Sequence, residues 1–173
     1  TLSVLEAARQ AGVKRVVFSG SSSVYGGVSE FPTPETALPS PKSPYALHKH
    51  VGMEYCRLYS ELHGLDTVSL LYFNVYGPHQ RTGGAYSTVI PAFMECAVEG
   101  KVCRIDGEGN QSRDFTYVSD VVQANILAAE RYFKFSGARF NIACAQTRSV
   151  NEIFDIINHS FDRSVKKYYA APR

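Results

Sequence analysis

Tyr45 and Lys49 stand four residues apart and carry side chains suited to acid and base chemistry. On a helix, residues at this spacing share a face, so the phenol and the ammonium would lie side by side. A free tyrosine loses its proton near pH ~10, and a nearby ammonium favours the phenolate, so the pair could act as a general base. A tyrosine and a lysine on a solvated helix face show the same spacing. The pair alone does not decide between these interpretations.

The residues around this pair predict a helix from Pro44 to His63. Serine at position 43 is a favoured N-cap, proline a favoured first helical residue, and Gly64 a favoured stop. Its large apolar residues recur at helical spacing and predict the buried stripe: Val51, Tyr55, Leu58 and Leu62. Tyr45, Lys49 and Gly52 then lie on a different face, where a preceding loop can cover them.

The elements before and after this helix alternate. Residues 1–11 predict a helix and residues 13–19 a buried strand, and the proline-containing segment 20–44 predicts a long loop. Residues 67–72 predict a second buried strand. The order indicates an α/β fold with a doubly wound, Rossmann-like parallel sheet.

The second half has a looser pattern, with a glycine-rich loop at 77–84. Its predicted elements are a helix over 87–99, a turn at 107–109 between short strands, a helix over 118–133, a strand over 139–142 and a capping box at Ser149 that begins a last helix. Gly107-Glu108-Gly109 lacks the third glycine and the following helix of a dinucleotide-binding loop.

Composition excludes several classes of function. The chain of 173 residues is 45% hydrophobic and 20% charged, with a net charge of +2 and no run of like charge, so we expect neither nucleic acid nor a membrane as partner. We find no secretory leader and expect a cytoplasmic protein. Four scattered cysteines predict reduced, mostly buried thiols, and five histidines share no metal-ligand spacing.

Several motifs stand in one order along nearly the whole chain. They are TLSVLEAARQAGVKRVVFSGSSSVYG, SPYALHK, LLYFNVYGP, GAYSTVIPAF, GEGNQSRDFTYVSDVVQAN, FNIA and SVNEIF. Together they resemble the extended short-chain dehydrogenase/reductase family, in particular its NAD-dependent nucleotide-sugar epimerases and dehydratases.

The resemblance implies a role for each catalytic residue. Ser21, four residues before Tyr25 of the V-Y-G motif, would hydrogen-bond the sugar hydroxyl, and Tyr45 would take its proton. Lys49 would hold the ribose of NAD. Without the resemblance, Ser21 is equally a residue of a polar loop. Cofactor-binding positions of the family fall on Ser19, Tyr45, Lys49 and Tyr72.

Ser22 and Ser23 bear on the type of reaction. Dehydratases of the family place acidic residues at one or both positions, whereas this chain has hydroxyls. It therefore resembles the 4-epimerases, and its three consecutive serines resemble epimerases acting on UDP-N-acetylhexosamines. A dehydratase or decarboxylase of the same family is the alternative.

Further positions correspond to the family's substrate site. Asn74 matches an asparagine that touches the substrate diphosphate, and Arg113 an arginine that grips it; a guanidinium can donate two hydrogen bonds to phosphate. Val89 and Ile105 match positions that line the uridine pocket, as Ser21, Ser22 and Ser23 match positions near the sugar. Tyr72 could equally be a core residue and Arg113 a surface partner of Asp114. Leu71 replaces a frequent arginine and Asp106 a frequent aromatic or amide.

The resemblance also implies an organisation. Residues 1–75 would be the C-terminal part of an NAD-binding domain, and 76–173 mainly a nucleotide-sugar lobe, with about 118–143 returning to the main sheet. The family's G-x-x-G-x-x-G turn does not occur in the chain. We therefore expect an internal fragment, inactive alone, of a homodimeric UDP-sugar epimerase that dimerises through a helix bundle. A module used only for binding or assembly is the non-enzymatic alternative.

Overall fold

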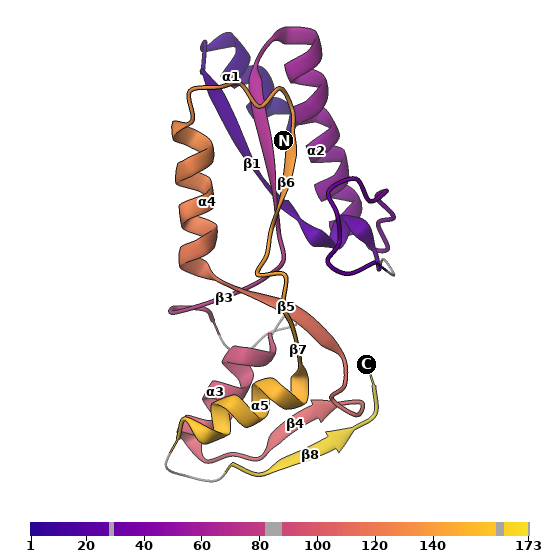
Figure 1. The fold of residues 1–173 in the computed structure, drawn as a ribbon, viewed down its shortest axis with the longest axis vertical. Helices are drawn as coiled ribbons and strands as arrows, with labels where there is room; N and C mark the ends of the chain where they lie inside the picture. Colours follow the sequence, from indigo (N-terminus) through magenta and orange to yellow (C-terminus); the bar gives the residue numbers. More distant parts are fainter. Residues whose placement is uncertain (28–29, 82–87, 162–164, 173) are drawn as a thin grey trace. The chain divides into compact units, whose positions relative to one another are not determined.

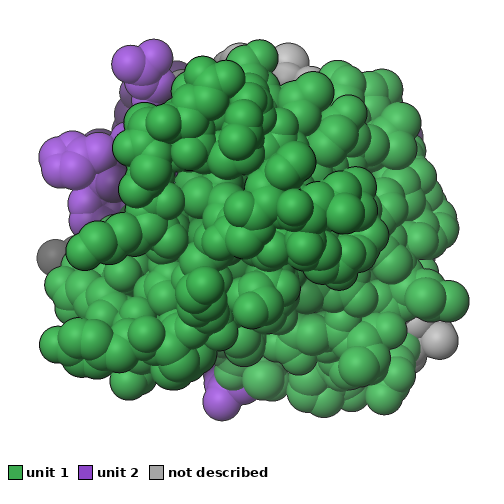
Figure 2. All heavy atoms as spheres, turned by 90° about the horizontal axis from the view of Figure 1, so that it is seen from above, with its two compact units in different colours: residues 1–75, 116–145 green, residues 76–115, 146–173 purple. Residues whose placement is uncertain are grey.

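The computed structural model describes residues 1–27, 30–81, 88–161 and 165–172. They form two compact units, which have different colours in Figure 2. The first unit contains Thr1–Val75 and Thr116–Ala145, and the second contains Tyr76–Phe115 and Gln146–Arg173.

The first unit is built on a parallel sheet with the strand order β1-β2-β6 (Figure 1). Strand β1 (Arg15–Ser21) pairs with β2 (Asp66–Tyr72) along its whole length, and β6 (Arg139–Ile142) pairs with the second half of β2. The predicted start of β1 at Val13 is wrong, because the Val13 amide still donates to Ala8 O (2.9 Å) in the turn that ends the first helix.

Helices cover both faces of this sheet. Helices α1 (Leu2–Gln10) and α2 (Pro44–His63) pack on the face that carries Phe18, and α4 (Val118–Glu130) packs on the face that carries Val17. Neighbouring strand residues point to opposite faces, which lets one strand serve both layers. The predicted α/β fold with a doubly wound sheet is confirmed.

The ends of α2 are as predicted, but only part of its predicted stripe packs on the core. Ser43 Oγ accepts a hydrogen bond from Ala46 N (3.1 Å), and Gly64 ends the helix in the left-handed conformation. The buried residues are Ala46, Gly52, Met53 and Cys56, whereas Val51 is 40% exposed and Leu62 71% exposed. Of the predicted stripe, Tyr55 packs partly buried against the core, whereas the prediction is wrong for Val51 and Leu62, which face away from the sheet.

The long loop after β1 contains a short 3-10 helix, η1 (Ser22–Tyr25). Tyr25 Oη donates to Asn141 Oδ1 (2.8 Å), and Asn141 Nδ2 donates to Thr33 O (2.8 Å). Glu35 Oε1 accepts from Asn141 N (3.0 Å). These bonds attach the loop to β6.

The second unit has its own core. Its elements are α3 (Val89–Glu99), β4 (Cys103–Asp106), β5 (Ser112–Tyr117, whose last two residues belong to the first unit), β7 (Thr147–Ser149), α5 (Val150–His159) and β8 (Lys167–Ala170); β3 (Asn74–Tyr76) lies at the unit boundary. Strand β4 pairs with β8 in parallel, and β5 with β7 in antiparallel orientation. The capping box at Ser149 is confirmed. The predicted helix start at Ser87 lies outside the described residues, as do the glycines at 83 and 84.

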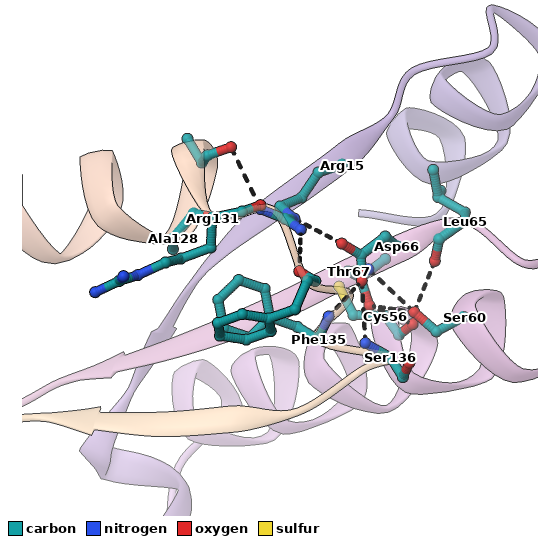
Figure 3. Close-up of polar contacts among 12 residues, drawn as sticks. Arg15, Cys56, Ser60, Leu65, Asp66, Thr67, Ala128, Arg131, Phe135 and Ser136 are labelled. Atoms are coloured by element: carbon teal, nitrogen blue, oxygen red, sulfur yellow. Dashed lines mark hydrogen bonds and ion pairs between the residues drawn. The ribbon is translucent and has the colours of Figure 1, made fainter.

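An ion pair fastens the first unit at the start of its two central strands. Arg15 Nε donates to Asp66 Oδ2 (2.6 Å), and the two side chains are 12% and 4% exposed (Figure 3). Asp66 Oδ1 also accepts from Phe135 N (2.8 Å) and Ser136 N (3.0 Å). The carboxylate therefore organises both its own strand and the segment that leads into β6.

Arg15 also ends helix α4. Its guanidinium donates to the backbone oxygens of Ala128 (2.8 Å), Arg131 (2.7 Å) and Phe133 (2.6 Å). The Ala128 carbonyl is one that the helix end leaves without an intrahelical partner, and the other two belong to the segment that follows the helix. The predicted helix end at Phe133 is wrong for this reason: Arg131 is already extended, and the chain turns over the guanidinium.

We predict that Asp66→Ala lowers the free energy of unfolding by about 3–5 kcal/mol, because it leaves a buried guanidinium without its counter-charge. Urea denaturation followed by circular dichroism measures this loss. Arg9→Ala is the control, since its ion pair with Glu6 lies in solvent and its loss should leave the midpoint nearly unchanged. Equal midpoints for Asp66→Ala and Arg9→Ala would contradict the prediction.

Candidate active site

The first turns of α2 present Tyr45 and Lys49 at the carboxyl end of β1. Lys49 Nζ donates to Ser19 O (2.7 Å) and lies 5.7 Å from the centroids of both the Tyr45 and Phe18 rings. Tyr45 is 57% exposed, and within the described residues its hydroxyl makes no hydrogen bond. The arrangement leaves a phenol open to a ligand with an ammonium beside its ring.

Ser21 is the last residue of β1 and the N-cap of η1. Its Oγ accepts hydrogen bonds from Ser23 N (3.2 Å) and Ser23 Oγ (2.9 Å). A hydroxyl has two acceptor lone pairs and one proton, so accepting twice leaves only the proton for a further partner. Ser21 is thus set up to donate to a bound oxygen atom.

Tyr72 ends β2 and stands opposite Ser21 in the strand register. Its hydroxyl lies 3.2 Å from Ser19 Oγ and 3.0 Å from Asn125 Oδ1. Tyr72 is half-buried and also packs against the core between the sheet and α4. Asn125 was not among the residues predicted for the site. The sequence signal for it was a polar side chain within the largely apolar predicted helix 118–133.

Tyr25 and Tyr45 both belong to sequence motifs, but they differ in burial. Tyr25 is 3% exposed, and burial raises the pKa of its phenol. Its proton is held by Asn141, so this tyrosine secures the loop. Burial separates a structural tyrosine from one that a ligand can reach.

The remaining predicted residues are placed as follows. Asn74 is half-buried at the start of β3. In the second unit, Arg113 is exposed and donates to Ser112 O (2.7 Å), whereas Asp114 is buried and accepts from Gln146 N (3.2 Å). Val89 packs partly buried against the core of that unit, and Ile105 lies within it at 1% exposure. Asn74 therefore belongs to the first unit, as do the catalytic residues, whereas Val89, Ile105 and Arg113 belong to the second.

A hollow of about 530 Å³ lies on the second unit. It is lined by Asp106, Gly107, Glu108, Asn110, Gln111 and Pro172. Asp106 forms an ion pair with Arg104 (2.7 Å). Two carboxylates make this hollow unsuitable for a phosphate group.

Two of the four cysteines, Cys56 and Cys103, are buried. Burial raises the pKa of the Cys56 thiol to about 11 and that of Cys103 to about 12, which disfavours their thiolates. Cys96 is half-buried and Cys144 exposed. Over the described ranges, no three histidine, cysteine or carboxylate side chains gather as metal ligands, and no helix has the length and apolarity to cross a membrane.

Comparison with known proteins identifies relatives of this chain. The model of the family described as NAD dependent epimerase/dehydratase matches residues 1–143. A UDP-glucose 4-epimerase of Mycolicibacterium smegmatis is 37% identical over 91% of this chain and 50% of its own length. A UDP-N-acetyl-alpha-D-glucosaminuronate decarboxylase of Bacillus cytotoxicus is 36% identical over 99% of this chain and 53% of its own length.

A solved structure has the same fold at high similarity. The UDP-N-acetylglucosamine 4-epimerase of Methanobrevibacter ruminantium M1, in complex with UDP-N-acetylmuramic acid, has a TM-score of 0.95 and 37% identity. The match covers 99% of this chain and 55% of that one. The chain spans about half the length of the relatives it matches.

Gly52 lets helix α2 pack closely on Phe18 of strand β1, next to the contact between Lys49 and Ser19. A Cβ at Gly52 would lie 2.5 Å from Phe18 Cζ, and Phe18 precedes the residue whose carbonyl receives Lys49. We predict that Gly52→Ala lowers the melting temperature, although alanine favours a helix over glycine by about 1 kcal/mol. Val51→Ala, at the exposed neighbouring position, is the control and should change it little. A higher melting temperature for Gly52→Ala would show that Phe18 moves aside without cost.

Proposed function

Because this chain belongs to the NAD-dependent epimerase/dehydratase family, we propose that the whole protein inverts C4 of a UDP-sugar. The substrate would be UDP-glucose or its N-acetylhexosamine form, interconverted with the galacto isomer. The observation that carries this proposal is the cluster of Tyr45, Lys49 and Ser21 at one end of the sheet, with hydroxyls at Ser22 and Ser23.

The residues present fit NAD at this edge. Open α/β sheets bind ligands at the carboxyl ends of their strands, where Ser19 and Tyr72 lie. Lys49 would hold the ribose, and Ser19 and Tyr72 would face the nicotinamide. When bound, NAD accepts a hydride from C4 of the sugar and returns it. In the second unit, Arg113 has the exposed guanidinium needed for a diphosphate.

Three side chains would move or hold the proton. Tyr45 would take the proton of the 4-hydroxyl, and the ammonium of Lys49 would stabilise the resulting negative charge. Ser21 has its lone pairs occupied by Ser23 and would donate a hydrogen bond to the sugar oxygen while Tyr45 takes the proton. The epimer would form without net oxidation when the hydride returns to the opposite face of C4 and the proton returns to the C4 oxygen.

The alternative is decarboxylation or dehydration. It is supported by the decarboxylase relative at 36% identity. Against dehydration, no acidic side chain stands at positions 22 and 23, where elimination of water would use one. Product analysis separates these reactions.

A homodimer remains part of the proposal. Helices α1 and α2 expose apolar side chains that a partner copy could cover: Leu2, Val4, Leu47, Val51 and Leu62.

We predict that the full-length protein converts UDP-glucose or UDP-N-acetylglucosamine to the galacto isomer, detected by proton NMR of the anomeric region. Tyr45→Phe should lower kcat about 10²–10⁴-fold, the usual contribution of a general base. Tyr59→Phe is the control, because it removes from the same helix a hydroxyl that donates to Glu6. Dehydrated or decarboxylated products, or full activity of Tyr45→Phe, would refute the proposal.

We further predict that the 173-residue chain alone binds UDP but not NAD, because it contains no G-x-x-G-x-x-G turn. Isothermal titration calorimetry with each ligand measures this directly. Arg113→Ala should weaken UDP binding and serves as the specificity control. Tight NAD binding by this chain would contradict the prediction and show that the described cluster suffices for the cofactor.

A further inference from the structure

Asn125 begins a chain of hydrogen bonds whose direction the structure determines. Its Nδ2 donates to Val121 O (2.7 Å), one turn earlier in α4. A backbone carbonyl only accepts hydrogen bonds, so the amino group must face Val121 and the amide oxygen must face the other way. The orientation of this amide is thereby fixed by chemistry.

The amide oxygen of Asn125 lies 3.0 Å from Tyr72 Oη. An amide oxygen only accepts, so Tyr72 uses its single proton for this bond. Toward Ser19 Oγ, 3.2 Å away, Tyr72 can therefore only accept. It follows that Ser19 is the donor in the Ser19–Tyr72 bond.

Ser19 then has no proton left for a ligand. Its side chain is exposed, so its remaining lone pairs face solvent, while its carbonyl receives Lys49 (2.7 Å). Ser21 lies two residues further along the same strand face and has the opposite polarity, because it accepts twice from Ser23. The strand thus offers an acceptor at Ser19 and a donor at Ser21.

We propose that Asn125 is a positioning residue that makes Ser19 a hydrogen-bond acceptor toward an N–H group of the bound cofactor. The inference rests on the proposed function, in which Ser19 faces the nicotinamide. The amino group of the nicotinamide carboxamide is an N–H donor of this kind. Without Asn125, Tyr72 can donate to Ser19, and the Ser19 proton can then point outward and repel that group.

Cofactor binding to the full-length protein tests the proposal without an activity measurement. The probes are NAD and 3-acetylpyridine adenine dinucleotide, in which an acetyl group replaces the carboxamide and no N–H donor remains. We expect the wild type to bind NAD about tenfold more tightly than the acetylpyridine analogue, because one hydrogen bond of typical strength gives a ratio of about ten between the two dissociation constants. Asn125→Leu should reduce this ratio to near one.

Two further variants keep the test independent of folding. Asn125→Asp retains an acceptor for the Tyr72 proton and should keep the preference for NAD. Ser19→Ala removes the acceptor at the other end of the chain and should abolish the preference. In the Ser19→Ala background, Asn125→Leu should then have no further effect on the ratio, since both changes act through one bond.

An unchanged ratio in Asn125→Leu or in Ser19→Ala would overturn the proposal. A wild type that shows the preference but fails to epimerise any UDP-sugar would overturn the proposed reaction and support the role of Asn125. A wild type that binds neither dinucleotide would overturn both.

Discussion

The ion pair between Arg15 and Asp66 joins the first residues of two neighbouring strands and so fixes which residues meet at their far ends. Arg15 stands opposite Asp66 in the register, and six positions later Ser21 stands opposite Tyr72. A slip by one residue would turn every side chain of β1 to the other face of the sheet. Ser19 and Ser21 would then point away from Tyr72. The pair therefore sets the geometry of a site at the opposite end of the sheet.

The same pair connects the strands to the helix that carries Asn125. Arg15 binds the carbonyls at the end of α4, while Asp66 binds the amides of Phe135 and Ser136. Helix α4 is thus held at its C-terminal end, and Asn125, about one turn from that end, is placed against Tyr72. On the other face, Gly52 lets α2 approach Phe18, which brings Lys49 to the carbonyl of Ser19. Helix α2 thus supplies Lys49 to the backbone of Ser19, and helix α4 supplies Asn125 to Tyr72 on the neighbouring strand.

Local signals predicted the parts of this arrangement that depend on neighbouring residues. The caps at Ser43 and Gly64, the capping box at Ser149 and the strand 139–142 follow from residue type and spacing, and all agree with the structure. Contacts between distant residues were not predictable in this way. Arg15 and Asp66 are 51 positions apart, and neither carries a sequence signal for the other. Two members of the predicted stripe of α2 were misassigned: Val51 and Leu62 are apolar but face away from the sheet. Gly52, which carries no hydrophobic signal, packs on Phe18 instead.

The functional residues show the same division. The spacing of Tyr45 and Lys49 predicted a shared helix face, but only burial distinguishes exposed Tyr45 from Tyr25, whose proton is committed to Asn141. Likewise, residue type gives no indication that Ser19 and Ser21 differ, since both have the same hydroxyl. The difference lies in which bonds each hydroxyl already makes: Ser19 gives its proton to Tyr72, and Ser21 receives two from Ser23. A polar side chain is a specific ligand contact when it can only donate or only accept a hydrogen bond, and here Ser23, Tyr72 and Asn125 determine which of the two each serine can do.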